Sequence, residues 1–195
     1  MSECDKALGF WKIGIQYLHL VQAVSSETLR QGNAYMVMSD ETITADQYME
    51  RTKWSDHNMV IPLLFNFYHG LETILKGFLC AKRKQSKPSH KLSQLLTSFK
   101  AECQHSVLIP YFEKYIEKDK LPNILSEFCK KSNISIDDYY QALKYSEGTS
   151  GNQFQHYPLK HQGQKGIQFF IELQDDIEKI RRETVFFGRQ ICPNA

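Results

Sequence analysis

Three polar residues stand at helical spacing inside an otherwise apolar run: His69, Glu72 and Lys76. Residues three, four or seven positions apart share one face of an α-helix, and Glu four residues before Lys is the favoured orientation for an ion pair. Two hypotheses follow from this arrangement. Either the three side chains line a pocket for a nucleotide or phosphate, or Glu72 and Lys76 form a partly buried, mutually satisfied pair that fixes helix packing.

A second group of side chains that could do chemistry lies in and beside residues 145–166, a segment with four Gly and one Pro. Glycine lets a ligand approach the backbone closely, and Lys, His and Tyr can contact phosphate, stack on bases and transfer protons. The candidate residues are Lys144, Tyr145, Glu147, His156, His161 and Lys165. The alternative is a flexible connector whose polar side chains serve only solubility.

The sequence predicts no metal site and no cofactor. His69 and Glu72 have the spacing of two metal ligands on one helix, but metal sites in helical bundles draw ligands from several helices. No second motif of this kind is present, and the chain contains no Walker loop, nucleophile elbow or dinucleotide-binding fingerprint.

The elements that must position these side chains are predicted to be helices of one domain spanning residues 1–195. Only ten Gly and six Pro interrupt the 195 residues, and 42% of the residues are apolar. Apolar residues recur at helical spacing in residues 5–30, 59–84 and 166–187, which should form two or three long core helices. Shorter peripheral helices are expected in residues 45–54, 90–100, 108–118, 122–131 and 135–144. The predicted fold is an all-α helical bundle, in which only residues 153–159 are compatible with a strand.

The helix over residues 59–84 should be the most buried one, because apolar residues cover most of its circumference. The remaining polar strip holds Asn66, His69, Thr73 and Lys76, with Glu72 at its border. This placement is what makes the three polar residues either a structural lock or the wall of a pocket.

Charge and cysteine usage predict a cytoplasmic protein. The net charge of +2 is too small to demand a nucleic-acid or membrane partner, and no apolar run approaches the roughly 18 residues of a membrane span. The first residues lack the basic-then-apolar order of a signal peptide. Five scattered cysteines, none in a C-x-x-C pair, indicate no disulfide framework and a reducing compartment.

Three stretches together resemble the HEPN family (higher eukaryotes and prokaryotes nucleotide-binding). They are H-G-L-E-T-I-L-K-G-F-L at residues 69–79, P-S-H-K-L-S-Q-L-L at 88–96 and A-L-K-Y-S-E-G at 142–148. The resemblance runs from about residue 5 to residue 187. It implies a helical bundle, a homodimer, and either RNA cleavage or a non-catalytic role in nucleotide binding or scaffolding.

Catalytic members of that family carry Arg, four to six residues and then His near the final helix. Here Lys144 stands in place of the Arg, Ser146 replaces a Pro, and His156 follows twelve residues later. Arg51 and His57 have the right spacing, but they precede the central helix. The departures argue against ribonuclease activity.

Three functions stay open at this point. The favoured one is a non-catalytic HEPN-like domain of a toxin–antitoxin or defence-type system, which binds RNA, a nucleotide or a nucleotidyltransferase-type partner protein. The second is a metal-independent ribonuclease with His156 or His161 as base and Lys144 as phosphate clamp. The third is a structural interaction domain. A homodimer would bury the aromatic ends of the first and last helices, Phe10, Trp11, Phe186 and Phe187.

Overall fold

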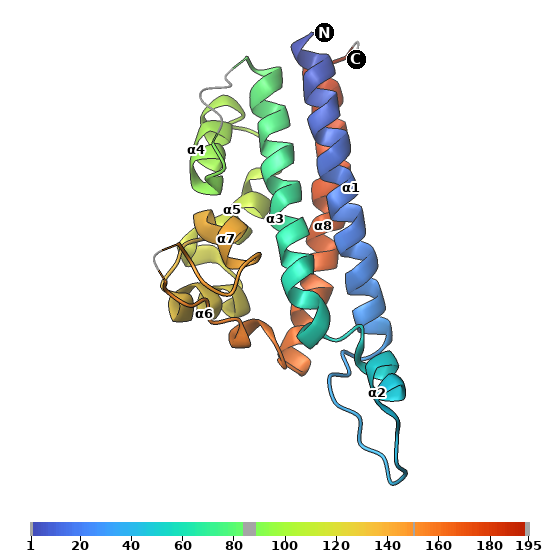
Figure 1. Cartoon of the computed structure of the whole chain (residues 1–195). Coiled ribbons are helices and arrows are strands. Elements are labelled where there is room, and N and C mark those ends of the chain that lie inside the picture. Colours follow the sequence, from blue (N-terminus) through green and yellow to red (C-terminus); the bar gives the residue numbers. More distant parts are fainter. Residues whose placement is uncertain (1, 84–88, 150, 194–195) are drawn as a thin grey trace.

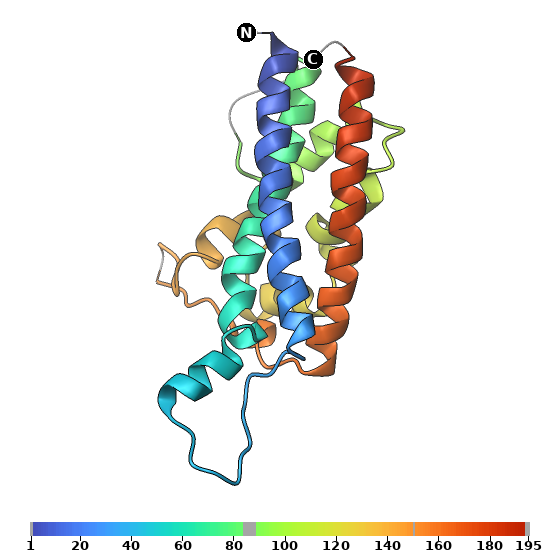
Figure 2. The same cartoon turned by 90° about the vertical axis from the view of Figure 1, so that its right-hand side faces the viewer.

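Three long helices form the body of the protein. The structure is a computed structural model that describes residues 2–83, 89–149 and 151–193. Helices α1 (Glu3–Arg30), α3 (Asp56–Ala81) and α8 (Gln164–Ile191) run side by side along the long axis (Figures 1 and 2). α1 packs along α3, and α8 contacts both. No strand occurs in the described ranges, so the predicted all-α bundle is confirmed.

Short helices build a second layer on one side of α3 (Figure 1). This layer contains α4 (Leu92–Glu102), α5 (Ile109–Ile116), α6 (Asn123–Ser132) and α7 (Tyr139–Ala142). The single 3₁₀ turn η1 (Lys118–Lys120) lies between α5 and α6, η2 (Ile136–Asp138) lies between α6 and α7, and η3 (Tyr157–Leu159) lies between α7 and α8. The remaining helix, α2 (Ala45–Thr52), projects with its preceding loop at the end of the bundle opposite the termini (Figure 2).

One predicted capping sequence sets a helix start, that of α2. The Thr44 hydroxyl accepts a hydrogen bond from the backbone of Gln47, whose side chain accepts one from the Thr44 backbone, and this reciprocal box opens α2. Ser135 and Asp138 form the same box. It opens only the turn η2, however, and α7 ends at Ala142, two residues short of the predicted end.

The structure corrects several predicted helix ends, one predicted cap and one possible strand. α3 begins at Asp56, before the predicted start, and ends at Ala81, while the predicted last residue, Lys84, lies outside the described residues. Ser89 does not cap α4, because its hydroxyl bonds the Gln94 side chain and the Lys91 backbone instead. α8 runs past residue 187 to Ile191. Residues 153–159 hold one bridge to residue 147 and the turn η3 rather than a strand.

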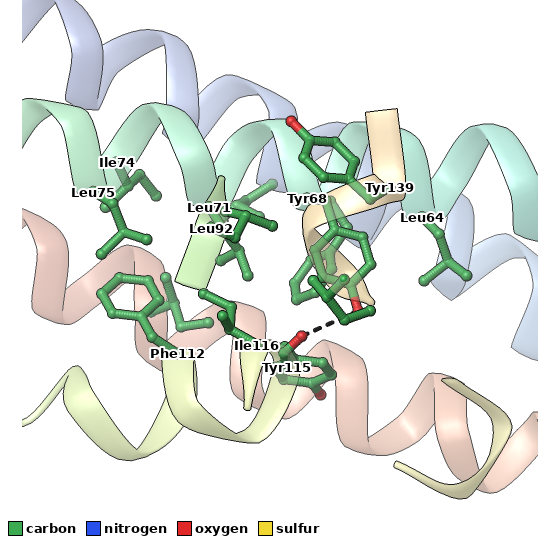
Figure 3. Close-up of a cluster of buried hydrophobic side chains, with 14 of the residues drawn as sticks. Leu64, Tyr68, Leu71, Ile74, Leu75, Leu92, Phe112, Tyr115, Ile116 and Tyr139 are labelled. Atoms are coloured by element: carbon green, nitrogen blue, oxygen red, sulfur yellow. Dashed lines mark hydrogen bonds between the residues drawn. The ribbon is translucent and has the colours of Figure 1, made fainter. Parts of the chain in front are cut away.

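The core is centred on α3, which buries 16 of its 26 residues, more than either α1 or α8. Its apolar side chains meet those of α4, α5 and α7 in one cluster (Figure 3). Three tyrosines, Tyr68, Tyr115 and Tyr139, are almost fully buried in this cluster. The Tyr68 hydroxyl donates to the Tyr115 carbonyl oxygen at 3.2 Å, which satisfies a polar group that would otherwise be buried without a partner.

Trp11 occupies the junction of the three long helices. A Cβ atom at Gly77 of α3 would lie 2.6 Å from the indole ring, and one at Gly188 of α8 would lie 3.0 Å from it. Both positions therefore need glycine for the helices to approach. Trp11 is 4% exposed and Phe187 packs on Phe78, so of the aromatic ends predicted for a dimer only Phe186 is largely exposed.

A disulfide joins Cys4 in the first turn of α1 to Cys192 just after α8, while Cys80, Cys103 and Cys129 are buried free thiols. The sequence indicated no disulfide framework, and it did not predict this single bond. Disulfides persist in oxidising compartments, so the cysteines no longer support a cytoplasmic location, which stays a prediction. None of the helices in the described ranges combines the length and apolarity needed to cross a membrane.

Replacing Cys4 by Ser should lower the free energy of unfolding by about 2–4 kcal/mol, because the bond closes a loop with a sequence separation of 188. Urea denaturation with and without dithiothreitol measures this change. The reductant should destabilise the wild type and leave Cys4→Ser unaffected. Five reactive thiols in the urea-denatured, unreduced wild type, instead of three, would contradict the disulfide.

Candidate functional site

The carboxylate of Glu72 is the centre of the polar strip on α3. Glu72 is 2% exposed, and donors from three separate elements surround it. Lys76 Nζ lies 2.5 Å from Oε1, and His90 Nδ1, in the lead-in to α4, lies 2.9 Å from the same oxygen. The Tyr139 hydroxyl of α7 donates to Oε2. Because an ionised carboxylate only accepts hydrogen bonds, His90 carries its proton on Nδ1.

Two opposing effects act on this carboxyl. Burial raises the pKa of Glu72, and the hydrogen bonds from Lys76, Tyr139 and His90 together outweigh it, so the net pKa lies below the ordinary value. Burial and the bond to Glu72 raise the pKa of the Tyr139 hydroxyl far above its ordinary value. At neutral pH the site therefore holds an ionised Glu72 carboxylate beside a protonated Tyr139 phenol.

His69 does not join Glu72 and Lys76, although sequence spacing groups the three. Its ring packs edge-on against Tyr17 at 4.8 Å between centroids and lies parallel to Phe65. Its Nδ1 atom is buried without a hydrogen-bond partner among the described residues. The predicted triad is thus an ion pair plus a separate imidazole packed between aromatic rings.

An aromatic and cationic surface begins where the Glu72 network reaches solvent. We call it the Tyr140 surface and define it by His90, Tyr140, Lys144 and Tyr145. The His90 side chain is 71% exposed, and its ring lies 6.3 Å from that of Tyr140. Lys144 Nζ lies 5.2 Å from the ring centroids of both Tyr140 and Tyr145. These tyrosines are 41% and 52% exposed, so ring faces and a cation are presented together.

The described parts of the segment 145–166 are anchored to the fold, which argues against the flexible-connector alternative. Phe154 and Leu159 are buried, and residue 147 forms an antiparallel bridge with residue 153. His156 Nε2 lies 2.5 Å from the Ala142 carbonyl oxygen, and its ring stacks on Phe128. Both contacts hold His156 against the body of the protein.

A second polar cluster, which the sequence did not reveal, closes the far end of the bundle. Asp56, 1% exposed, accepts hydrogen bonds from the backbone N–H groups of His161 and Gln162 at 2.9 and 2.8 Å. It also accepts one from Asn33 Nδ2 at 3.0 Å. We call this the Asp56 corner. It fixes the loop before α8 onto the start of α3.

His57 and His161 face each other at this corner, with 3.0 Å between His57 Nδ1 and His161 Nε2. The side chain of His161 thus has His57 and Tyr35 as neighbours, whereas that of Lys144 has Tyr140 and Tyr145. Partial desolvation of the ring, together with the nearby Lys160 and His161, lowers the pKa of His57. The structure does not bring Lys144, His156 and His161 into one set of contacts.

Two hollows in the described surface lie apart from both polar clusters, since neither is lined by Glu72 or Asp56. Their volumes are about 680 and 670 Å³, they lie where α4, η1, η2 and α6 meet, and their linings share Ile116, Lys118, Ser135 and Ile136. Lys100 and Lys120 in the first hollow are already paired with Glu117. No group of three or more His, Cys, Asp or Glu side chains suited to a metal ion occurs in residues 2–83, 89–149 and 151–193.

Tyr139→Phe should lower the free energy of unfolding by about 1–3 kcal/mol, because it removes a donor from a buried carboxylate. Urea denaturation at pH 7 measures the change. Tyr157→Phe is the matched control, since Tyr157 is 57% exposed. Equal stabilities of the two variants would show that the Tyr139 hydroxyl does not support Glu72.

The stabilisation that Glu72 gains from its partners should depend on pH with a definite sign. A carboxyl whose pKa is lower in the folded state stabilises the protein above its unfolded pKa, here 4.5, and loses this effect as the pH falls through the folded pKa. The difference in unfolding free energy between wild type and Glu72→Gln should therefore shrink on acidification below pH 4.5. The exposed Glu127, replaced by Gln, is the control. A difference that grows on acidification would refute the assignment.

Comparison of the chain with protein-family models, curated proteins and solved structures finds no match in any of the three.

Proposed function

We propose that the protein is a divergent HEPN-like domain that binds nucleotides or single-stranded RNA on the Tyr140 surface and does not cleave them. The observation that carries the proposal is the position of Lys144 Nζ between two exposed tyrosine rings. The family resemblance of the sequence supports the same ligand class.

The chemistry of this surface suits a single strand. Aromatic side chains stack on bases of any sequence, and each such contact contributes about 1–3 kcal/mol to binding. The hydrogen bond to Tyr145 raises the pKa of Lys144, which is a cation at neutral pH and can pair with a phosphate. A lysine offers a point charge without the two-pronged geometry of arginine, so binding should be weak and dependent on salt.

The positions of the two histidines support binding without cleavage. A general base must reach the proton that it removes, directly or through one water molecule. His156 is held by the Ala142 carbonyl oxygen, and His161 contacts His57 at the Asp56 corner. These contacts of the two imidazoles are with groups other than the Lys144 ammonium, so they do not support the ribonuclease alternative.

The wider assignments of this proposal rest on the resemblance. They are a homodimer, a role in a toxin–antitoxin or defence-type system, a nucleotidyltransferase-type partner protein and a cytoplasmic location. Phe186, 60% exposed on α8, is the one predicted interface aromatic that is open to a second copy in the described structure.

Tyr140→Ala should weaken binding of a fluorescent single-stranded RNA by about 1–3 kcal/mol, because it removes one stacking face. Lys144→Ala should lower the slope of log affinity against log salt by about 0.7, the contribution of one phosphate contact on a single strand. Fluorescence anisotropy over a salt series measures both quantities, and gel analysis of the recovered RNA should show no cleavage.

Tyr157→Ala and Lys12→Ala remove an exposed tyrosine and an exposed lysine outside the Tyr140 surface, and both should bind like the wild type. Cleavage that His156→Ala abolishes would support the ribonuclease instead. Absence of binding to any RNA or nucleotide would leave the structural interaction domain.

A further inference from the structure

We propose that His57 and His161 form a binding site for a divalent transition-metal ion of the Zn²⁺ class, built from two imidazole nitrogens at the Asp56 corner. The site is separate from the Tyr140 surface and does not depend on the proposed function.

The separation of the two ring nitrogens fits a shared metal. His57 Nδ1 and His161 Nε2 are 3.0 Å apart. Two imidazoles bound to Zn²⁺ at about 2.0–2.1 Å with a tetrahedral angle have nitrogens about 3.3 Å apart. An ion can therefore replace the proton that now links the nitrogens with a shift of a few tenths of an ångström.

The orientation of the rings is also compatible. Their centroids are 4.6 Å apart and their planes are inclined by 35°. This centroid distance is shorter than a straight N–H···N bond between two imidazoles requires, so the lone pairs do not both lie along the line between the nitrogens. Joint coordination of a third atom requires lone pairs that leave this line toward the same side. Both histidines are exposed, which gives an ion access and leaves its other positions to water.

The backbone that carries the pair is held in place before any ion binds. His161 has a φ of +57°, a left-handed conformation that non-glycine residues rarely adopt and that the surrounding structure must enforce. The buried Asp56 carboxylate enforces it by accepting the backbone N–H groups of His161 and Gln162. Asn33 holds Asp56 from the other side, and a Cβ atom at Gly166 would press on both.

Glycine at position 161 would adopt the same conformation at lower cost, so the backbone itself does not require a histidine there. What the histidine adds is a ring that faces His57. His57 is equally fixed, since it lies in the first turn of α3, directly after Asp56.

Isothermal titration with ZnCl₂ of the full chain tests the site. The wild type should bind one Zn²⁺ ion through this pair, and the ion should raise the unfolding temperature because it links residues 104 positions apart. His57→Ala and His161→Gly should each weaken binding at least as much as the roughly 10–100-fold caused by loss of an outer-shell partner. His105→Ala, at another exposed histidine, should bind like the wild type.

His161→Gly keeps the test meaningful, because glycine relieves the left-handed strain while it removes the imidazole. Its unfolding temperature without metal should equal or exceed that of the wild type, so loss of Zn²⁺ binding there is not a folding defect. Wild-type affinity in both His57→Ala and His161→Gly, or no Zn²⁺ binding by the wild type at millimolar concentration, would overturn the proposal.

Discussion

The second layer of the fold depends on one electrostatic requirement, the neutralisation of a carboxylate buried in the central helix. An ionised group removed from water destabilises the protein by several kcal/mol unless charged and hydrogen-bonded partners surround it. Glu72 finds Lys76 on its own helix, but the other two partners, His90 and Tyr139, arrive from different parts of the chain. The lead-in to α4 and the helix α7 are thereby fixed against α3. The exposed rings of Tyr140 and Tyr145, which follow Tyr139 in the chain, are therefore also held in position.

That arrangement also explains why the exposed Tyr140 and Lys144 are held as a surface. Tyr139 is anchored by its hydroxyl, and its neighbour Tyr140 is turned outward on the same short helix. Lys144 follows one turn later and lies between Tyr140 and Tyr145. Within residues 139–145, Tyr139 thus faces inward to the buried Glu72, while Tyr140, Lys144 and Tyr145 form the exposed Tyr140 surface.

The long helices and the Glu72–Lys76 ion pair depend on interactions between residues close in sequence, so the sequence could predict them. Helical periodicity placed α1, α3 and α8, and the spacing of Glu72 and Lys76 placed their ion pair on one face. Contacts between residues that are far apart in the sequence could not be predicted from local patterns. No local pattern around Asp56 predicts that its carboxylate accepts hydrogen bonds from the backbone N–H groups of residues 161 and 162. Five scattered cysteines likewise gave no indication that Cys4 pairs with Cys192. Similarly, spacing alone grouped His69 with Glu72, whereas packing against Tyr17 separates it.

The bond between Cys4 and Cys192 has a mechanical consequence. It ties the start of α1 to the end of α8 at the same end of the bundle, where both termini lie (Figure 1). A pull applied to the residues just outside the two cysteines is carried by the covalent bond and does not load the helices between them. Because the disulfide closes the chain between residues 4 and 192 into a ring, a force pulling on the two ends is not transmitted to the residues inside that ring. Stretching therefore leaves α3 and the side chains around Glu72 in place until the disulfide is reduced.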